Sequence, residues 1–150
     1  LPKRYTLNEN ELLEDIRMLF FDHPAADGKS LRLCDGLDGV SFEADGHLLL
    51  RVLENMTVNA LEATEEGGEV RFWIEHENGG IVFCVWNGQV IPKSIRKRVF
   101  QRNVSTKEAS GRGLGTYSMK FFGEECLGGA IHFSTSETEG TVFRFRLPMQ

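Results

Sequence analysis

Residues 55–63, which read Asn-Met-Thr-Val-Asn-Ala-Leu-Glu-Ala, are the most informative stretch of this chain. Asn55 and Asn59 are four residues apart, so in a helix they lie on one face about one turn apart. Asparagine is a poor helix former, so two of them in an otherwise strong helix need a reason. Either they hydrogen-bond to neighbouring backbone, or they project from the helix to bind a polar ligand.

A long helix surrounds this stretch. Asp45 is the predicted N-cap, the helix covers residues 47–64, and Gly67-Gly68 ends it. From Glu69 the hydrophobic period changes to two, which predicts a strand. The turn Asn78-Gly79-Gly80 then leads into a nearly all-apolar second strand, so the sequence predicts a β-hairpin here.

The rest of the chain divides by the same signals. The further predicted elements are a helix at 7–21 capped by Asn8 or Asn10, strands at 31–33 and 40–43, a short helix at 92–100, a flexible loop at 101–112, a helix at 113–126, and strands at 130–136 and 141–147. One α+β domain follows, with a mixed, mostly antiparallel sheet and helices on one face.

Three glycines at alternate positions, Gly111, Gly113 and Gly115, run directly into the predicted helix at 113–126. Glycine permits close backbone approach, and a helix N-terminus offers unpaired N–H groups and about half a positive charge to an anion. Lys107 and Arg112 add cations before this helix. Glycines also mark simple hinges, but the two cations and the following helix favour phosphate binding. The run is not a Rossmann or P-loop fingerprint, because Gly-Lys-Ser/Thr and the strand-to-loop spacing are absent.

Two turns complete the set of candidate sites. Asn87-Gly88 follows the second strand of the first hairpin, and the Asn87 amide can both donate and accept a hydrogen bond. Gly140-Thr141 stands at the turn into the last strand. Taken alone, each is an ordinary turn.

Taken in order, these motifs resemble the motif series of the histidine kinase catalytic domain. The series is helical N-x-x-x-N-A-x-x-A, a degenerate N-G-x-x-I-P turn, Phe100 with Ser105-Thr106-Lys107, G-R-G-L-G-T-Y, and G-T. This domain is one branch of the Bergerat-fold ATPases, with the gyrase-type, mismatch-repair and heat-shock chaperone ATPases. The resemblance covers roughly residues 44–148 and implies a two-layer α/β sandwich with a mobile lid over ATP. Asn55 favours the kinase branch, because the gyrase and chaperone branches usually carry Glu or another residue there.

The resemblance also implies residue roles. Asn59 would bind Mg²⁺ through its amide oxygen, a hard ligand suited to that ion, and Asn55 would assist the phosphates. Lys107 and Arg112 would neutralise the transferring phosphoryl group, so the catalytic residues would be these two and Asn55. The other nucleotide-binding residues would be Asn87, Gly88 and Thr141 at the adenine, and Gly111, Arg112, Gly113, Leu114 and Gly115 around the triphosphate. Residues 101–112 would form the lid, with Phe100 as the anchor of its hinge.

The turn at Asn87 departs from the family pattern, in which an Asp followed by two glycines accepts from the adenine amino group. If Val85-x-Asn87 fills the motif, Asn87 meets adenine and the turn is one residue short. If Ile91-Pro92 fixes the register, Trp86 stands where the Asp would. We prefer Asn87, because an amide accepts from the amino group and donates to the ring nitrogen. A neutral hydrogen bond is worth about 0.5–1.5 kcal/mol against about 1.5–3 for a charged one, so we expect ATP binding about tenfold weaker than with Asp.

None of the four histidines fits the phosphoacceptor of this family. His76 and His132 fall in strands, His47 lies in the first turn of the long helix, and His23 precedes Pro24. The resemblance therefore places the acceptor on a dimerisation domain of the same protein, a homodimer at full length, with a response regulator that then takes the phosphoryl group. Residues 1–30 are interpreted as a helix and linker from that dimerisation region, and residues 31–150 as the catalytic domain.

Composition limits the partners. The 150 residues carry a net charge of −5, which argues against a nucleic-acid or anionic-membrane surface. Cys34, Cys84 and Cys126 show no paired spacing, which favours reduced thiols in a cytoplasmic compartment. No apolar run approaches the roughly 20 residues that span a bilayer. The sequence also starts without an initiator Met, so we expect any membrane contact to come from segments outside this chain.

Two other functions stay open. The altered turn at Asn87 would suit a nucleotide-binding pseudokinase, against which the intact Asn pair, Lys107 and glycine run argue. A Bergerat-type ATPase acting on water, or a serine kinase, is the other alternative, and it lacks the catalytic Glu expected at Asn55.

Overall fold

A five-stranded sheet with helices on one face forms the body of the protein. The computed structural model describes residues 3–34, 39–101 and 113–149. In chain order the elements are β1 (Tyr5–Asn8), α1 (Glu9–Phe20), η1 (Pro24–Ala26), β2 (Ser30–Leu33), β3 (Ser41–Ala44), α2 (Gly46–Ala63), β4 (Glu69–Glu77), β5 (Gly80–Asn87), η2 (Arg96–Arg98), α3 (Gly113–Lys120), η3 (Phe121–Cys126), β6 (Ala130–Ser136) and β7 (Gly140–Pro148).

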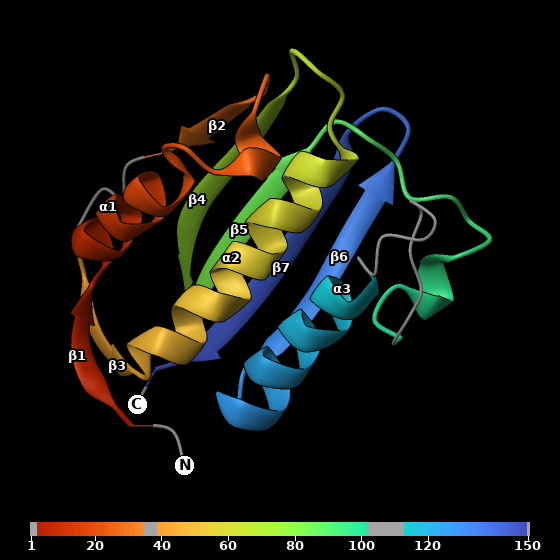
Figure 1. The fold of residues 1–150 in the computed structure, drawn as a ribbon. Helices are drawn as coiled ribbons and strands as arrows, with labels where there is room; N and C mark the ends of the chain where they lie inside the picture. The colour runs from red at the N-terminus through yellow and green to blue at the C-terminus, as the bar shows by residue number, and fades with distance from the viewer. Residues whose placement is uncertain (1–2, 35–38, 102–112, 150) are drawn as a thin grey trace.

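The strand order of the main sheet is β2-β4-β5-β7-β6, and β1 and β3 form a separate two-stranded sheet. The β2–β4 pair is parallel, while β4–β5, β5–β7 and β6–β7 are antiparallel. The helices α1, α2 and α3 lie over the same face of the main sheet (Figure 1). This confirms the predicted α+β sandwich with a mixed, mostly antiparallel sheet.

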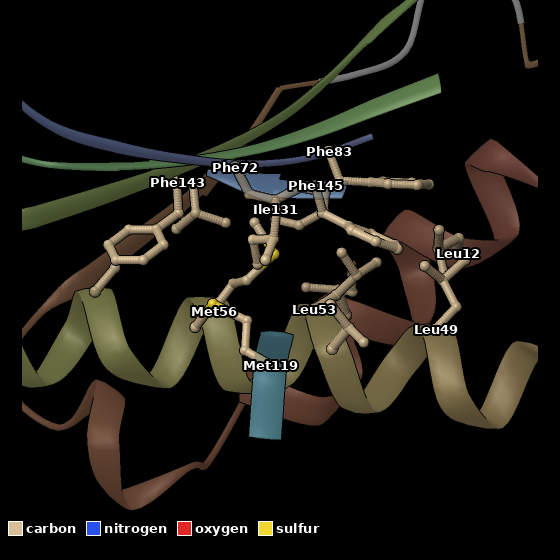
Figure 2. Packing of buried hydrophobic residues seen from close by; sticks show 14 of the residues in the cluster. Leu12, Leu49, Leu53, Met56, Phe72, Phe83, Met119, Ile131, Phe143 and Phe145 are labelled. Atoms are coloured by element: carbon tan, nitrogen blue, oxygen red, sulfur yellow. The ribbon is translucent and has the colours of Figure 1, made fainter. Parts of the chain in front are cut away.

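The core lies between this face and the helices (Figure 2). Alternate residues of β4, β5 and β7 point toward the helices, because side chains alternate between the two faces of a strand. Phe72, Phe83 and Phe145 are fully buried on the sheet side, and Leu53 and Met56 of α2 are fully buried opposite them. Burying a side chain of this size stabilises the fold by about 1.5–3 kcal/mol, so this layer fixes α2 on the sheet.

The long helix begins where the sequence predicts. The Asp45 carboxylate accepts hydrogen bonds from the Leu48 backbone N–H at 3.1 Å and the Lys3 backbone N–H at 2.8 Å. The bond from Leu48, with that from Lys3, holds the pKa of Asp45 below its usual value. At the other end the helix stops at Ala63, and Gly67 follows with φ +84°. The predicted N-cap and glycine stop are confirmed.

The N-terminal segment differs from the prediction at its start. Residues 5–8 form β1, paired with β3, and the helix begins only at Glu9. The cause is Asn8, whose side chain accepts from the backbone N–H groups of Asn10 and Glu11 and so caps the helix at that point. Asn8 is thus the cap, and the predicted start at residue 7 is too early.

Helix α1 packs onto the same core as the rest of the chain. Its buried residues are Glu9, Leu12, Leu13, Ile16 and Phe20. The Glu9 carboxylate meets His76 Nε2 of β4 at 2.5 Å, which ties the start of α1 to the sheet. The described part of residues 1–30 is therefore packed with the predicted catalytic domain, while its origin in a dimerisation region stays a prediction.

The predicted helix at 92–100 is shorter in the structure. Only η2 is helical, and around it run separate three-residue turns, with Ile95 N–H donating to Pro92 O, Arg98 N–H to Ile95 O, and Gln101 N–H to Arg98 O. Such i to i+3 bonds do not propagate into an α-helix. The predicted loop at 101–112 lies outside the described residues, apart from Gln101.

The predicted helix at 113–126 is helical throughout but changes type. After α3, η3 is a π-helical turn, in which Leu127 N–H donates to Phe122 O. Gly123 lies on the sheet side of this turn, where a Cβ would come 2.9 Å from the Phe145 ring. The wider turn thus sits against β7 at a point where only glycine fits.

The three cysteines are free thiols. Cys84 is fully buried, and burial raises its pKa to about 12. That the thiols are reduced in the protein's own compartment stays a prediction. Within the described residues, no helix is long and apolar enough to cross a membrane.

Candidate functional site

Asn87 and Thr141 are direct partners across the β5–β7 pair. Both are polar and yet almost completely buried, with 2% and 1% of their surface exposed. Buried polar groups are costly unless they are hydrogen-bonded, so their partners decide what this end of the sheet can do.

A chain of hydrogen bonds with a fixed direction joins these two residues. Ile91 N–H donates to Thr135 Oγ1 at 2.9 Å, the hydroxyls of Thr135 and Thr141 are 2.8 Å apart, and Thr141 Oγ1 donates to Gln89 O at 2.6 Å. Because the single hydroxyl hydrogen of Thr141 goes to Gln89 O, Thr135 must donate to Thr141. Gln89 N–H in turn donates to Asn87 Oδ1 at 2.9 Å. The turn after β5 is thereby fixed from both sides.

Gly140 explains why a glycine precedes Thr141. Its φ is +81°, in the left-handed region that favours glycine. A Cβ there would come 2.3 Å from Asn87 O and 3.0 Å from Gly88 Cα. The β6–β7 turn therefore packs directly against the turn of Asn87-Gly88, two turns that only the family resemblance had placed together.

Asn55 and Asn59 are placed differently. Both are half-buried on α2, and their neighbours Met56 and Ala60 are buried in the core. Neither amide forms a hydrogen bond with the part of the chain that the structure describes, whereas Thr57, between them, donates to a backbone carbonyl of its own helix at 2.8 Å. The alternative in which the two asparagines bond to neighbouring backbone is therefore wrong, and within the described residues both amides lack a hydrogen-bond partner.

The last three residues of the predicted phosphate-binding run lie in α3. Gly113, Leu114 and Gly115 form the first turn of this helix, and Thr116 and Met119 are buried behind it. Helix α3 packs beside α2. The N-terminal end of α3, the C-terminal half of α2, the end of β5 and the start of β7 lie toward the same end of the molecule (Figure 1). Lys107, Gly111 and Arg112 lie outside the described residues, as do Ser105 and Thr106.

Phe100 packs where the predicted lid begins. Its ring centroid is 5.9 Å from that of Phe133 and 5.9 Å from that of Phe143, edge-on to the latter. The Lys120 ammonium of α3 lies 5.1 Å from the Phe100 ring centroid. Residue 100 thus packs against both the sheet and α3, while its role as a hinge anchor stays a prediction.

Sequence reasoning missed Gln89 and Thr135. Gln89 acts through its backbone alone, so its side chain gave no signal. Thr135 could have been found, because closing the last hairpin at residues 137–140 pairs it with Thr141, as the structure has it. Glu54, which neighbours Asn55 in sequence, faces His23, with its carboxylate 3.9 Å from Nε2 and its side chain about a third exposed.

The chain is similar to histidine kinases and to the ATPases related to them. A family model described as histidine kinase-, DNA gyrase B-, and HSP90-like ATPase matches residues 44–150. The heme sensor protein HssS of Staphylococcus aureus (strain Newman) is 31% identical over 141 residues, which cover 93% of this chain and 30% of HssS. The chain thus spans less than a third of that relative.

Solved structures agree with this match. The nucleotide-free catalytic domain of histidine kinase ThkA has a TM-score of 0.78 and 27% identity, covering 98% of this chain and 96% of that one. ThkA in complex with the response regulator protein TrrA has a TM-score of 0.76 and 26% identity, covering 98% of this chain and 42% of that one.

Proposed function

The chain belongs to the histidine kinase-, DNA gyrase B- and HSP90-like ATPases, and from that premise we propose that it binds ATP and transfers its γ-phosphoryl group to a histidine on another domain. The observation that carries the proposal is the meeting of three features at one end of the sheet. These are the fixed turn at Asn87, the amides of Asn55 and Asn59, which no described residue bonds, and the N-terminus of α3.

The turn at Asn87 is proposed as the base site, together with Gly88 and Thr141. Its hydrogen bonds are already made before any nucleotide arrives, so binding would not have to order it. The exposed Gly88 lets a flat ring approach the backbone, because it carries no side chain.

The amides of α2 are proposed as the metal and phosphate site. Among the described residues no group of three or more His, Cys, Asp or Glu side chains could hold a metal ion. Mg²⁺ suits a site with a single protein amide oxygen, because it keeps several waters and takes its other ligands from phosphates. The Asn59 amide, to which no described residue bonds, fits that role, and Asn55, one turn earlier, would donate to a phosphate oxygen. When bound, Mg²⁺ would neutralise charge on the phosphates.

Charge stabilisation would come from residues around the start of α3. The amide groups of Gly113, Leu114 and Gly115 stand at a helix N-terminus, where unpaired N–H groups favour an anion. Lys107, Gly111 and Arg112 precede them in sequence, and the two cations are proposed to meet the transferring phosphoryl group. Phosphoryl transfer needs mainly positioning and charge stabilisation, which such a set supplies.

The phosphoacceptor and the next partner are proposed to lie outside this chain. The acceptor histidine would be on a dimerisation domain of the same, homodimeric protein, from which residues 1–30 would lead, and the product would pass to a response regulator. The complex of ThkA with TrrA supports such a partner. The site would face the cytoplasm, where ATP is available.

The experiment uses the longer protein that carries this domain. With Mg²⁺ and γ-labelled ATP, we expect label on a histidine, stable to alkali and labile to acid. Lys107→Ala should reduce labelling at least about a hundredfold, because one charge-stabilising group in phosphoryl transfer is worth that much. The matched control is Lys3→Ala, an exposed lysine beside the N-cap of α2, which should label normally. A folded wild-type protein that binds ATP and never becomes labelled would instead be a pseudokinase.

A further inference from the structure

The orientation of the Asn87 amide bears on which nucleotides the site accepts. We infer that Asn87 presents a hydrogen-bond donor to the base, so that the site takes 6-oxopurine nucleoside triphosphates as well as 6-aminopurine ones. The inference rests on the proposed function, because it takes Asn87 to be the residue that meets the base.

The backbone of the turn fixes which end of the amide faces the site. Gln89 N–H lies 2.9 Å from the Asn87 side chain, and only the amide oxygen can accept from it. The amide nitrogen therefore points away from Gln89. Asn87 is only 2% exposed, and Gln89 is itself held by Thr141 at 2.6 Å, so neither partner is free to turn.

The other hydrogens of this cluster are already committed. The hydroxyl hydrogen of Thr135 goes to Thr141, and that of Thr141 goes to Gln89 O. In the described part of the chain no group accepts a hydrogen bond from Asn87 Nδ2. In the same part of the chain, every fully buried side-chain nitrogen or oxygen has a hydrogen-bond partner. The amide nitrogen consequently keeps some exposure to solvent, and among the described residues no acceptor engages its hydrogens.

A donor at this position does not distinguish the two kinds of purine strongly. Adenine carries an acceptor at N1 beside its amino group, and a 6-oxopurine carries an acceptor at O6, so an NH₂ group finds a partner on either. An ionised carboxylate, in contrast, is an acceptor only. Placed against the 6-position, it would bind the adenine amino group and repel O6, and it could accept from a 6-oxopurine only through N1–H, one ring atom away. Replacing Asp by Asn therefore changes base selectivity, beyond the loss of affinity expected from the sequence.

The expected selectivity between ATP and inosine triphosphate depends on which hydrogen-bonding groups stay unpaired with Asn87 and with Asp at this position. With Asn87 both bases make one hydrogen bond to the amide nitrogen, so we expect the dissociation constants of ATP and inosine triphosphate to agree within about tenfold. A site that hydrogen-bonds a particular group rejects an analogue lacking it far more strongly. Asn87→Asp should therefore raise the preference for ATP over inosine triphosphate by at least about tenfold.

The experiment is a calorimetric titration of this chain with Mg²⁺-ATP and Mg²⁺-inosine triphosphate. The two nucleotides differ only on the base edge in question. Asn87→Asp is the informative variant, because its carboxylate still accepts from Gln89 N–H and preserves the turn. Asn87→Ala is the second variant. It removes the donor, so both nucleotides should bind more weakly while their ratio stays within about threefold of wild type.

The outcomes separate the inference from the proposed function. A narrow wild-type ratio that widens in Asn87→Asp supports the inference. A wild-type preference for ATP above about a hundredfold, or a ratio that Asn87→Asp leaves unchanged, overturns it while the proposed function stands. If neither nucleotide binds the folded wild type or either variant at millimolar concentration, the proposed function fails and the inference fails with it.

Discussion

Asn87 and Asn59 are both asparagines of the candidate site, but the protein treats their amides in opposite ways. Asn87 is buried, accepts from Gln89 N–H, and belongs to a chain of bonds through Thr141 and Thr135. Asn59 is half-buried on α2, and no described residue bonds to its side chain. The end proposed for the base is therefore organised by the protein itself. Among the described residues, the end proposed for phosphate and metal has no such network around Asn59.

This difference has an energetic meaning. A preorganised site avoids the cost of ordering side chains on binding. An asparagine in a helix without a partner lowers folding stability, because its helix propensity is poor. Substitutions at the base end should therefore reduce stability, whereas Asn55→Ala and Asn59→Ala at the phosphate end should reduce binding without a loss of stability.

The largest expected loss of stability comes from Gly140→Ala. The new methyl group would come 2.3 Å from Asn87 O, on a backbone with φ +81°. We expect the free energy of unfolding to fall by about 3 kcal/mol, from the backbone conformation and the clash together. Gly67→Ala is the control, because Gly67 has φ +84° and nothing within 4 Å of its Cβ position. It should lose only about 1–2 kcal/mol in urea unfolding. Equal losses would mean that the contact between the two turns contributes nothing.

Thr141→Val should have the next largest effect. Valine keeps the shape but leaves Gln89 O and the Thr135 hydroxyl without their partner, which costs about 1–3 kcal/mol. Thr138→Val, at an exposed hydroxyl of the same hairpin, should change stability by less than about 0.5 kcal/mol. Thermal unfolding of both variants measures the difference. A loss as small for Thr141 as for Thr138 would show that the base end is not fixed by this hydroxyl.

Asp45→Ala tests the helix that carries the phosphate end. Loss of this N-cap should lower stability by about 1 kcal/mol at neutral pH. Because the Leu48 and Lys3 N–H groups hold the pKa of Asp45 below 3.8 in the folded state, its stabilisation is complete above that value. It is lost as the pH falls through the lowered pKa.

The difference between wild type and Asp45→Ala should therefore shrink below about pH 3.8 in unfolding titrations. Asp15→Ala, on the exposed face of α1, should show little difference at either pH. A gap between wild type and Asp45→Ala that persists at pH 2 would contradict the capping role.

The smallest expected effect has the opposite sign. Asn59→Ala should raise the free energy of unfolding by about 0.5 kcal/mol, because alanine is the better helix former and no described hydrogen bond is lost. Asn55→Ala should behave alike. A destabilisation above about 1 kcal/mol in either variant would show that the amide has a structural partner, and the contrast with Asn87 would then disappear.

Most of the fold could be predicted because its signals are local. Asp45 and Gly67 mark the two ends of α2, and the turn Asn78-Gly79-Gly80 closes the first hairpin. A hydrophobic period of two identifies β4. The start of α1 was missed because residues 5–8 pair with β3, which lies more than thirty residues away in sequence. The π-helical turn was missed because it depends on Gly123 meeting Phe145 of another strand.

The site was predictable in its residue types and less so in its connections. The spacing of Asn55 and Asn59 placed both amides on one face of α2, and no hydrogen bond joins either amide to a described residue. No sequence pattern indicated that Gln89 N–H orients the Asn87 amide, because a backbone contact leaves no trace in residue identity. The roles of Lys107, Gly111 and Arg112 remain predictions from the sequence.

The most direct test is calorimetric titration of this chain with ATP, with and without Mg²⁺, in wild type and Asn59→Ala. We predict micromolar to sub-millimolar binding that Mg²⁺ strengthens in wild type, and that loses this dependence in an Asn59→Ala variant at least as stable as wild type. No binding of ATP to the folded wild type at millimolar concentration, or an unchanged Mg²⁺ dependence in Asn59→Ala, would contradict the account.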